Sequence, residues 1–392
     1  MKTSVIGYPR IGVLRELKFA SEKYFKKEIT MEELQDTAAQ LRKTHWENQK
    51  KYGIDFIPSN DFSFYDNLLD TAVLLDIVPK RYRKLGLGKL DTYFAMARGY
   101  QGDYGDVKAL GMKKWFNTNY HYIVPEVEDD LVIALEGTKP FDEYQEAKSY
   151  GIETKPVITG IYTLLKALRF TGEKDITDIK AAVVNAYKDI LTKFDEYGAK
   201  WVQFDEPALV MDLSVEDILL LKELYGEILN AKGNVKVLLQ TYFGDIRDCY
   251  AALMTLPFDG IGLDFVEGTE SLDLVRTGFS ADKTLFAGVV NGKNIWKNNY
   301  TKTLDVVKKL ECCAKNIVIG TSCSLLHVPY TIRTETKLEE SYKKYFAFAE
   351  EKLCELSELK EIIDDDICLD HPKYQANQAV FAKPRDCINE YV

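Results

Sequence analysis

The stretch KWVQFDEP, residues 200–207, is an apolar run that ends in two acidic residues and a proline. Runs rich in β-branched and aromatic residues and closed by turn-forming residues are typical of buried strands. Because proline cannot donate a ladder hydrogen bond, Pro207 predicts that this strand ends at the acidic pair. We therefore expect Asp205 and Glu206 at the carboxyl end of a buried strand.

Similar runs recur along the chain, and a helical pattern follows each of them. We expect eight strands, in VIGYP (5–9), DFIPSND (55–61), KPVITG (155–160), KWVQFDEP (200–207), VKVLLQTYF (235–243), GIGLDFVEG (260–268), LFAGVVNG (285–292) and NIVIGTSCS (316–324). Alternating strands and helices predict a parallel sheet, and this number of units over 392 residues predicts an α/β fold, the (β/α)8 TIM-type barrel. A doubly wound open sheet is the alternative.

Two segments fall outside this alternation. Residues 80–154, between the second and third strands, contain KKWFNTNYHYIVPE, which is rich in aromatic and amide side chains and too polar for a core helix. We expect this segment to be an excursion over the barrel mouth. The alternation is lost after about residue 363, so we expect a barrel domain over 1–363. Residues 364–392 are then the start of an interdomain linker or a truncated tail.

One helix is delimited by local signals. Thr30 and Glu33 form a capping-box pattern at its start, and Gly53 stands where a C-terminal cap is expected. His45 lies within this helix beside Trp46, and we expect it to be at the surface or half buried.

Composition restricts the classes of function. With 46% hydrophobic and 12% aromatic residues the chain can fill a sizeable core, whereas its net charge of -10 argues against nucleic acid or an anionic membrane as the main partner. No apolar run approaches the roughly 20 residues of a membrane helix. The N-terminal MKTSVIGYPR lacks the apolar core of a signal peptide, so we expect a cytoplasmic location. Seven cysteines without a repeated CxxC predict reduced thiols.

Polar residues stand at most of the predicted strand ends, where a barrel places its ligand-binding face. They are Tyr8, Pro9, Arg10, Ser59, Asn60, Asp61, Asp205, Glu206, Thr241, Asp264, Glu267, Asn291 and Cys323. Neighbours in a strand point to opposite faces, so only one of Asp205 and Glu206 can face the barrel axis. A structural role, in which one acid accepts hydrogen bonds from backbone amides of a neighbouring loop, stays open.

Basic residues gather after the first predicted strand, in GYPRIGVLRELKFA (7–20). Arg15 and Lys18 are three residues apart and share one helical face. Cations near a helix N-terminus oppose the helix dipole, so local stability does not explain them and an anionic ligand would. Pairing with Glu16 or Glu22 on a solvated surface is the alternative.

Other signatures of chemistry are weak. GVVNGKN (288–294) is one residue short of a phosphate-binding loop and lacks the following Ser or Thr, and no GxGxxG follows a strand. TSCSLLHVPY (321–330) places Cys323 and His327 four apart, without further ligands nearby in the sequence. From these patterns alone we expect an acidic barrel that binds an anionic small molecule.

A resemblance extends this interpretation. The stretches IGYPRIGVLRELKFA, DFSFYDNLLDTA, DTYFAMARG, KKWFNTNYHYIVPE, WVQFDEPALV, LFAGVVNGKNIW and TSCSLLHVPY, in this order, resemble the N-terminal half of cobalamin-independent methionine synthase. The resemblance covers about residues 3 to 360 and is most specific in WFNTNYHYIVPE and SCSLLHVP. It implies a methyltransferase of methionine biosynthesis, which transfers methyl from 5-methyltetrahydropteroyl-polyglutamate to homocysteine.

The resemblance also implies where the parts of the site lie. The family uses two barrels, and the C-terminal barrel holds zinc and most contacts to homocysteine and the pterin. Carried over residue by residue, the folate-tail contacts fall on Arg15, Glu16, Leu17, Lys18 and Lys114. We expect no catalytic residue, metal ligand or cofactor in this chain, and a C-terminal barrel with zinc as its partner.

The chain has about half the family's usual length, so we expect it to be inactive alone. A free-standing folate-binding or anion-binding barrel without catalysis is the alternative.

The resemblance also gives an expectation for the TSCSLLHVPY stretch. In the family's zinc barrel the ligands are a His and a Cys two apart at one strand end, a Glu at the next, and a Cys at the last. The equivalent positions here are Thr241, Phe243, Asp264 and Cys323. Zinc normally requires three or four N, S or carboxylate ligands, and only two of these residues qualify. We expect a remnant, with Cys323 buried like a small apolar residue and His327 not a ligand.

Overall fold

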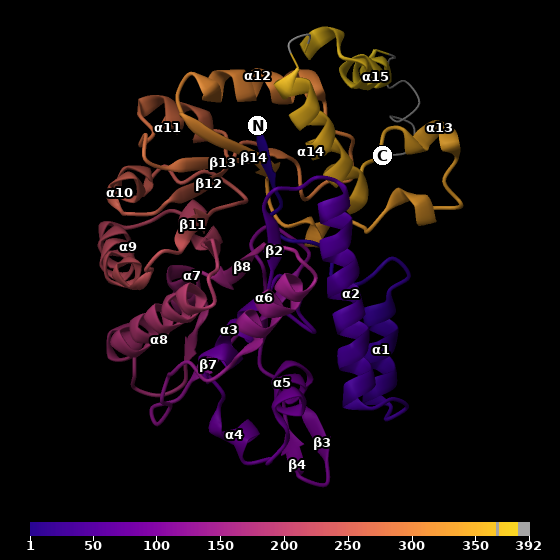
Figure 1. The fold of residues 1–392 in the computed structure, drawn as a ribbon. Coiled ribbons are helices and arrows are strands. Elements are labelled where there is room, and N and C mark those ends of the chain that lie inside the picture. The colour runs from indigo at the N-terminus through magenta and orange to yellow at the C-terminus, as the bar shows by residue number, and fades with distance from the viewer. Residues whose placement is uncertain (366–367, 383–392) are drawn as a thin grey trace. The chain divides into compact units, whose positions relative to one another are not determined.

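The computed structural model describes residues 1–365 and 368–382 (Figure 1). The chain divides into two compact units, one formed by Met1–Phe56 and Asp264–Val392, the other by Ile57–Leu263. The parallel sheet has eight strands in the order β1-β14-β13-β12-β11-β10-β8-β2. This order follows the chain without the reversal of a doubly wound sheet, and a parallel bridge joins Ser4 to Phe56, just before β2. The predicted (β/α)8 TIM-type barrel is confirmed.

Seven of the eight predicted strands overlap an observed strand, and the first lies just before its predicted range. Their bounds are β1 Lys2–Ser4, β2 Ile57–Ser59, β8 Thr154–Thr159, β10 Trp201–Asp205, β11 Lys236–Gln240, β12 Gly260–Asp264, β13 Thr284–Val290 and β14 Asn316–Thr321. The position of the first strand was predicted wrongly, because the ladder of β1 with β14 ends at Ser4. Gly7 and Pro9 explain the difference, since glycine weakens a strand and proline cannot donate to its ladder.

The first unit contains β1, β13, β14 and the helices around them. These helices are α1 Glu16–Phe25, α2 Met31–Lys51, α11 Ser271–Thr277, α12 Tyr300–Glu311, α13 Glu340–Lys343, α14 Ala349–Asp364 and α15 Pro372–Phe381. Helices α1 and α2 pack side by side (Figure 1). The capping box of Thr30 and Glu33 is confirmed, and Gly53 has a φ of 70° after α2. His45 was predicted wrongly, because its side chain is buried.

The C-terminal helix α15 is held against α12 within this unit. Asn377 Oδ1 accepts a hydrogen bond from Tyr300 N (3.1 Å), and its Nδ2 donates to Asn298 O (2.9 Å). Residues 366–367 and 383–392 of the predicted tail lie outside the described residues. The predicted boundary between a barrel domain and a linker stays a prediction.

The second unit contains β2, β8, β10, β11 and most of β12. Its helices are α3 Asn67–Leu74, α4 Lys80–Arg83, α5 Lys89–Arg98, α6 Lys139–Ser149, α7 Ile161–Ala167, α8 Ile176–Glu196, α9 Val215–Ile228 and α10 Tyr250–Thr255. Short strands between β2 and β8 form two hairpins, β3 Tyr100–Gly102 with β4 Gly105–Val107 and β5 Met112–Lys114 with β6 His121–Ile123. A further short pair joins β7 Glu126–Val127 to β9 Arg169–Phe170. The aromatic-rich excursion is therefore present, and its position over the barrel mouth stays a prediction.

The packing of β10 against two helices shows which way its side chains point. Helix α8 is amphipathic, with buried residues recurring at helical spacing at Val183, Tyr187, Ile190 and Phe194. The ring of Phe204 in β10 lies 5.6 Å from that of Tyr187 in α8 and 6.1 Å from that of Tyr225 in α9. Phe204 thus points to the helices, and its neighbours Gln203 and Asp205 point to the opposite face of the sheet.

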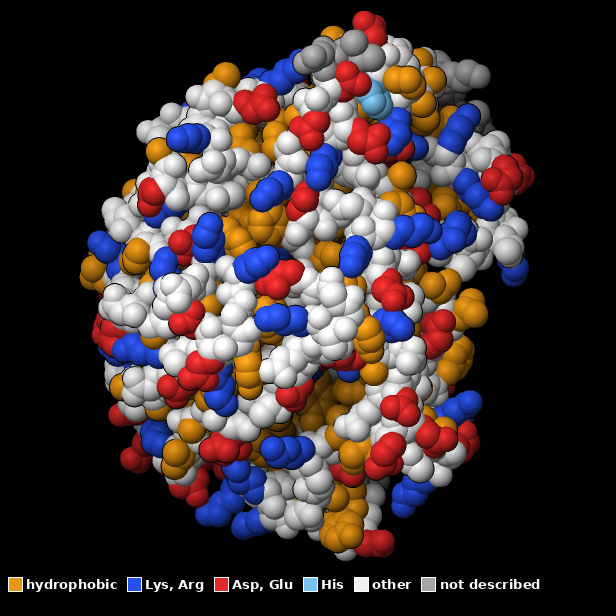
Figure 2. All heavy atoms as spheres, viewed as in Figure 1, with side chains coloured by type: hydrophobic (Ala, Val, Ile, Leu, Met, Phe, Trp, Pro, Cys, Tyr) orange, Lys and Arg blue, Asp and Glu red, His pale blue; other side chains and the backbone are white. Residues whose placement is uncertain are grey.

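The surface has mixed charge. On the face shown in Figure 2, Lys and Arg side chains are interspersed with Asp and Glu side chains. Among the described residues, no helix combines the length and the apolar character that a membrane span requires.

Candidate functional site

The acidic pair at the end of β10 has two different environments, and Glu206 is a structural residue. Its Oε1 accepts hydrogen bonds from Tyr162 N (2.8 Å) and the Tyr225 hydroxyl (2.5 Å), and its Oε2 accepts from Thr163 N (2.7 Å). These amides lie at the N-terminus of α7, and a Cβ on Gly160 would be 2.1 Å from Glu206 Cδ. Burial raises the pKa of Glu206, and these donors act in the opposite direction. The structural alternative for one acid of the pair is confirmed.

Asp205, which is half-buried, belongs to a chain of polar groups on the opposite face of β10. Its Oδ1 accepts from Gln203 Nε2 (2.6 Å), and its Oδ2 accepts from the Tyr242 hydroxyl (3.2 Å). Lys155, in the neighbouring strand β8, is 2% exposed and donates from Nζ to Gln203 Oε1. The Gln203 amide therefore connects an ammonium group to a carboxylate, with its oxygen facing the lysine and its nitrogen facing the aspartate.

Burial perturbs both charged groups of this chain. It lowers the pKa of Lys155 against the opposing effect of Asp205 and Asp61, and it raises the pKa of Asp205. Perturbed titratable groups at the carboxyl end of a barrel strand mark a candidate functional site. The sequence prediction included Asp205 and Asp61 but missed Lys155, Gln203 and Tyr242. A lysine inside the apolar run KPVITG, and the i,i+2 spacing of Gln203 and Asp205, were the available signals.

The loop that carries Asp61 is held by a half-buried lysine. Lys139 Nζ donates to Asn60 Oδ1 and to Phe62 O, each at 2.7 Å, and pairs with Glu143 at 3.1 Å. Asn60 adopts a left-handed φ of 60° and donates from Nδ2 to Val157 O at 2.7 Å. The end of β2 is thus tied to β8, as expected for strand ends that converge on one rim.

The residues from Arg15 to Lys18 form the start of α1 in the first unit. Arg15 is the N-terminal cap, with a left-handed φ of 64°, and Glu16 Oε2 accepts from Leu14 N at 3.0 Å. Leu17 is 3% exposed, so its side chain belongs to the core. Lys18 is exposed, and its Nζ lies 3.8 Å from Glu22 Oε1. The alternative of pairing on a solvated surface is therefore realised for Lys18.

Arg15 differs from Lys18 in its surroundings. The Arg15 side chain is exposed, and within residues 1–365 and 368–382 its guanidinium makes no hydrogen bond or ion pair. A cation at a helix N-terminus is unfavourable without an anion beside it. Arg15 is thus available to an anionic ligand.

Lys114 lies in the second unit, at the end of β5. It is exposed and pairs in register with His121 of β6. Its ammonium group has no ion pair with any residue that the structure describes. Arg15 and Lys18 belong to the other unit, so the convergence of these three cations on one mouth stays a prediction.

The cysteine stretch in the first unit lacks the ligands of a metal site. Cys323 is 1% exposed, and burial raises the pKa of its thiol. Asp264 Oδ1 accepts hydrogen bonds from Val266 N (2.8 Å) and Glu267 N (2.9 Å), so the carboxylate stabilises the turn that follows β12. Burial lowers the pKa of His327 to about 4. Among the described residues no group of three or more His, Cys, Asp or Glu could hold a metal, so these side chains do not fit zinc.

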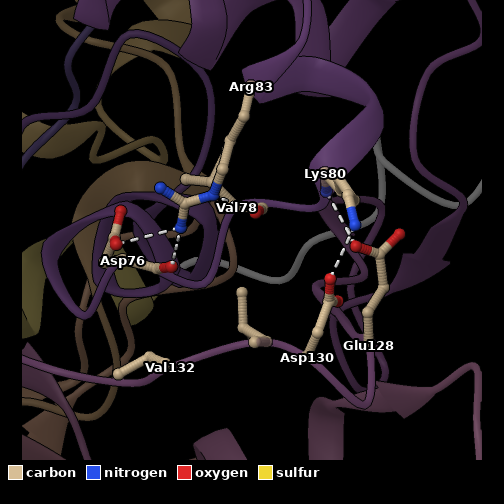
Figure 3. Close-up of a pocket in the computed structure, with 8 residues that line it drawn as sticks. Asp76, Val78, Lys80, Arg83, Glu128, Asp130 and Val132 are labelled. Atoms are coloured by element: carbon tan, nitrogen blue, oxygen red, sulfur yellow. Dashed lines mark hydrogen bonds and ion pairs between the residues drawn. The ribbon is translucent and has the colours of Figure 1, made fainter.

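A surface pocket of about 350 Å³ lies elsewhere in the second unit (Figure 3). Its charged side chains are already paired, Arg83 with Asp76 at 2.9 Å and Lys80 with Asp130 at 2.9 Å. Glu128 Oε2 accepts from Lys80 N at 2.7 Å. Both cations of the pocket are thus already paired, and the carboxylate that remains is negative, so the pocket does not suit an anionic ligand.

The fold and these groups define a (β/α)8 barrel with polar strand ends and exposed cations at the start of α1 and the end of β5. The chain belongs to the cobalamin-independent synthase family, whose N-terminal domain matches residues 2–315. The 5-methyltetrahydropteroyltriglutamate–homocysteine methyltransferase of Campylobacter jejuni subsp. doylei is 54% identical over 393 residues, covering 100% of this chain and 52% of the relative. The enzyme of that name from Streptococcus suis is 55% identical over 362 residues, covering 92% and 48%. The chain spans about half the length of these curated relatives.

Solved structures share the fold at low sequence identity. A B12-independent methionine synthase from Shewanella sp. W3-18-1 has a TM-score of 0.64 at 15% identity, covering 94% of this chain and 98% of its own. A putative B12-independent methionine synthase from Listeria monocytogenes has a TM-score of 0.62 at 15% identity, covering 93% and 100%.

Proposed function

We propose that the chain is the folate-tail-binding half of a cobalamin-independent methionine synthase. It holds the polyglutamate tail of 5-methyltetrahydropteroyl-polyglutamate, while a C-terminal barrel with zinc transfers the methyl group to homocysteine. The observation that carries the proposal is the exposed Arg15 guanidinium, which has no partner among the described residues and lies at a helix N-terminus. The relatives' printed name, which includes triglutamate and homocysteine, supports the choice of ligand.

The chemistry of the ligand fits these cations. A polyglutamate tail is a series of carboxylates, which arginine can hold bidentately and lysine as a point charge. Arg15, Lys18 and Lys114 supply both kinds of group. Fixing the far end of the folate orients its reacting end, which is a contribution to rate that needs no catalytic residue in this chain.

The test is binding of 5-methyltetrahydrofolate with one and with three glutamates, measured by calorimetry on the 392-residue chain. We expect the triglutamate to bind more tightly. Arg15→Ala and Lys114→Ala should each weaken triglutamate binding about tenfold, the loss of one charge-assisted contact. Lys23→Ala, at the other end of α1, is the matched control. Equal affinity for the two ligands would contradict the proposal.

A free-standing folate-binding barrel without catalysis would give the same binding result. Turnover separates the two functions. We expect no methyl transfer by the purified chain, and methyl transfer after addition of a C-terminal barrel loaded with zinc. Turnover by the chain alone would contradict the division of labour proposed here.

A further inference from the structure

We propose that Asp66 is the residue that positions Lys114 for the ligand's tail. Its carboxylate joins the N-terminus of α3 to β6, the strand that pairs with the strand of Lys114. The proposal rests on the proposed function and concerns the same site. Its evidence is the hydrogen bonding of one hairpin in the second unit.

The β5–β6 hairpin leaves one buried amide without a ladder partner. Its antiparallel register pairs Met112 with Ile123, Lys113 with Tyr122 and Lys114 with His121. Backbone hydrogen bonds run from Val124 N to Gly111 O (2.8 Å) and from Trp115 N to Tyr120 O (2.7 Å). Because hydrogen-bonded and non-hydrogen-bonded pairs alternate, Met112 and Ile123 form a non-hydrogen-bonded pair. The N–H of Ile123 therefore points away from β5.

Asp66 accepts that N–H and caps a helix with the same carboxylate. Its Oδ2 accepts from Ile123 N at 3.0 Å, and Ile123 is 0% exposed. Its Oδ1 accepts from Leu68 N (2.9 Å) and Leu69 N (3.0 Å), the first amides of α3. An N-cap needs one oxygen acceptor, which Ser, Thr or Asn supplies equally well. Aspartate supplies a second carboxylate oxygen, and in Asp66 this oxygen accepts the hydrogen bond from the hairpin.

The helix end to which the hairpin is tied is itself fixed. The Tyr93 hydroxyl accepts from Tyr65 N (3.0 Å) and from Asp66 N (3.3 Å). The Tyr120 hydroxyl, at the turn of the hairpin, donates to Tyr65 O at 3.0 Å. Two connections thus join the hairpin to the same short segment. Since the side chain of Lys114 is exposed, the backbone of the hairpin determines where its ammonium group can reach.

Two substitutions separate the connection from the cap. Asp66→Asn keeps one oxygen for the amides of α3 and places an NH2 group against the N–H of Ile123, so two donors face each other. In Asp66→Ser the serine hydroxyl can still cap α3, but the side chain is too short to reach the N–H of Ile123. This variant replaces Asp66→Asn in the experiment if the Asn variant does not fold. Asp175→Asn is the matched control, because Asp175 caps α8 by accepting from Thr177 N (2.7 Å) at an exposed position.

The experiment measures calorimetric affinity of the 392-residue chain for 5-methyltetrahydrofolate with one and with three glutamates. We expect Asp66→Asn to weaken triglutamate binding about fivefold, the effect of one net hydrogen bond, and to leave monoglutamate binding unchanged. In the Lys114→Ala background the same substitution should have no further effect. Hydrogen exchange at the Ile123 amide should become faster, while Asp175→Asn changes none of these quantities.

Other outcomes overturn the proposal in distinguishable ways. Equal losses for the two ligands, or a fivefold loss that persists without Lys114, would show that Asp66 only stabilises the fold. A normal affinity of Asp66→Asn beside a weakened Lys114→Ala would reject the positioning role and leave the proposed function intact. Full triglutamate affinity in Lys114→Ala would reject the positioning role together with the part of Lys114 in the site, and equal affinity of the parent for the two ligands would reject the proposed function itself.

Discussion

Replacement of Glu206 tests the hydrogen bonding at the end of β10. In Glu206→Gln the remaining oxygen can keep the bonds from Tyr162 N and the Tyr225 hydroxyl, and the new NH2 group then faces Thr163 N. One hydrogen bond to a charged acceptor is lost and a buried donor is left without a partner, which costs about 2 kcal/mol of unfolding free energy. Glu206→Ala removes all three bonds, and we expect a loss of about 4 kcal/mol.

Urea unfolding followed by circular dichroism at pH 7 measures these losses, with Asp175→Asn as the control. Gly160→Ala adds a second comparison, because its Cβ would lie 2.1 Å from Glu206 Cδ. We expect Gly160→Ala to destabilise the parent chain strongly and the Glu206→Ala chain less. Surface substitutions usually change the unfolding free energy by less than about 0.5 kcal/mol. If Glu206→Gln differs from the parent by no more than this, the inference that Glu206 accepts these hydrogen bonds as an ionised carboxylate is refuted.

Three further predictions concern buried titratable groups. Burial lowers the pKa of His45 to about 3 from 6.5, so the unfolded chain binds more protons in that window, and stability falls as pH drops. His45→Phe should remove about 3 kcal/mol of the loss between pH 6.5 and about 4. Lys155→Met leaves Asp205 buried without its ammonium partner, which raises the aspartate's pKa further. The variant's stability should therefore decrease as pH rises from about 4, and adding Asp205→Asn should restore stability at pH 8. Dialysis against a weak chelator followed by zinc analysis should find no zinc in the parent or in Cys323→Ser; stoichiometric zinc in the parent that disappears in the variant would contradict the remnant interpretation.

The sequence was sufficient for the fold because buried parallel strands are continuous apolar runs, and their order along the chain is also their order in the sheet. It was insufficient at β1, where VIGYP has the composition of a strand but the ladder with β14 ends at Ser4. The error at His45 was avoidable. Leu34, Ala38, Leu41 and His45 recur at helical spacing on the buried face of α2, so the pattern places the histidine in the core.

The candidate site was harder to predict, for a physical reason. Asp205 and Glu206 are adjacent and chemically alike, and only the packing of Phe204 against two helices decides which of them is structural. Lys155 comes from β8 and Tyr242 from the loop after β11, and their contact with the chain of Gln203 and Asp205 depends on register between strands. Arg15 and Lys18 stood out as cations near a helix N-terminus, whereas Lys114 could be found only by resemblance, because an exposed charge follows no periodicity.

The division of the chain into units has a consequence for its biosynthesis. The unit Ile57–Leu263 is continuous, so the ribosome releases all of it before the other unit is complete. The strand β1 is made first, yet its ladder partners are Val318, Ile319 and Gly320 of β14. The segment Lys2–Ser4 therefore lacks its β14 partners until Gly320 has been translated. A nascent chain arrested near residue 300 should expose this segment to chaperones and proteases while the continuous unit is already folded.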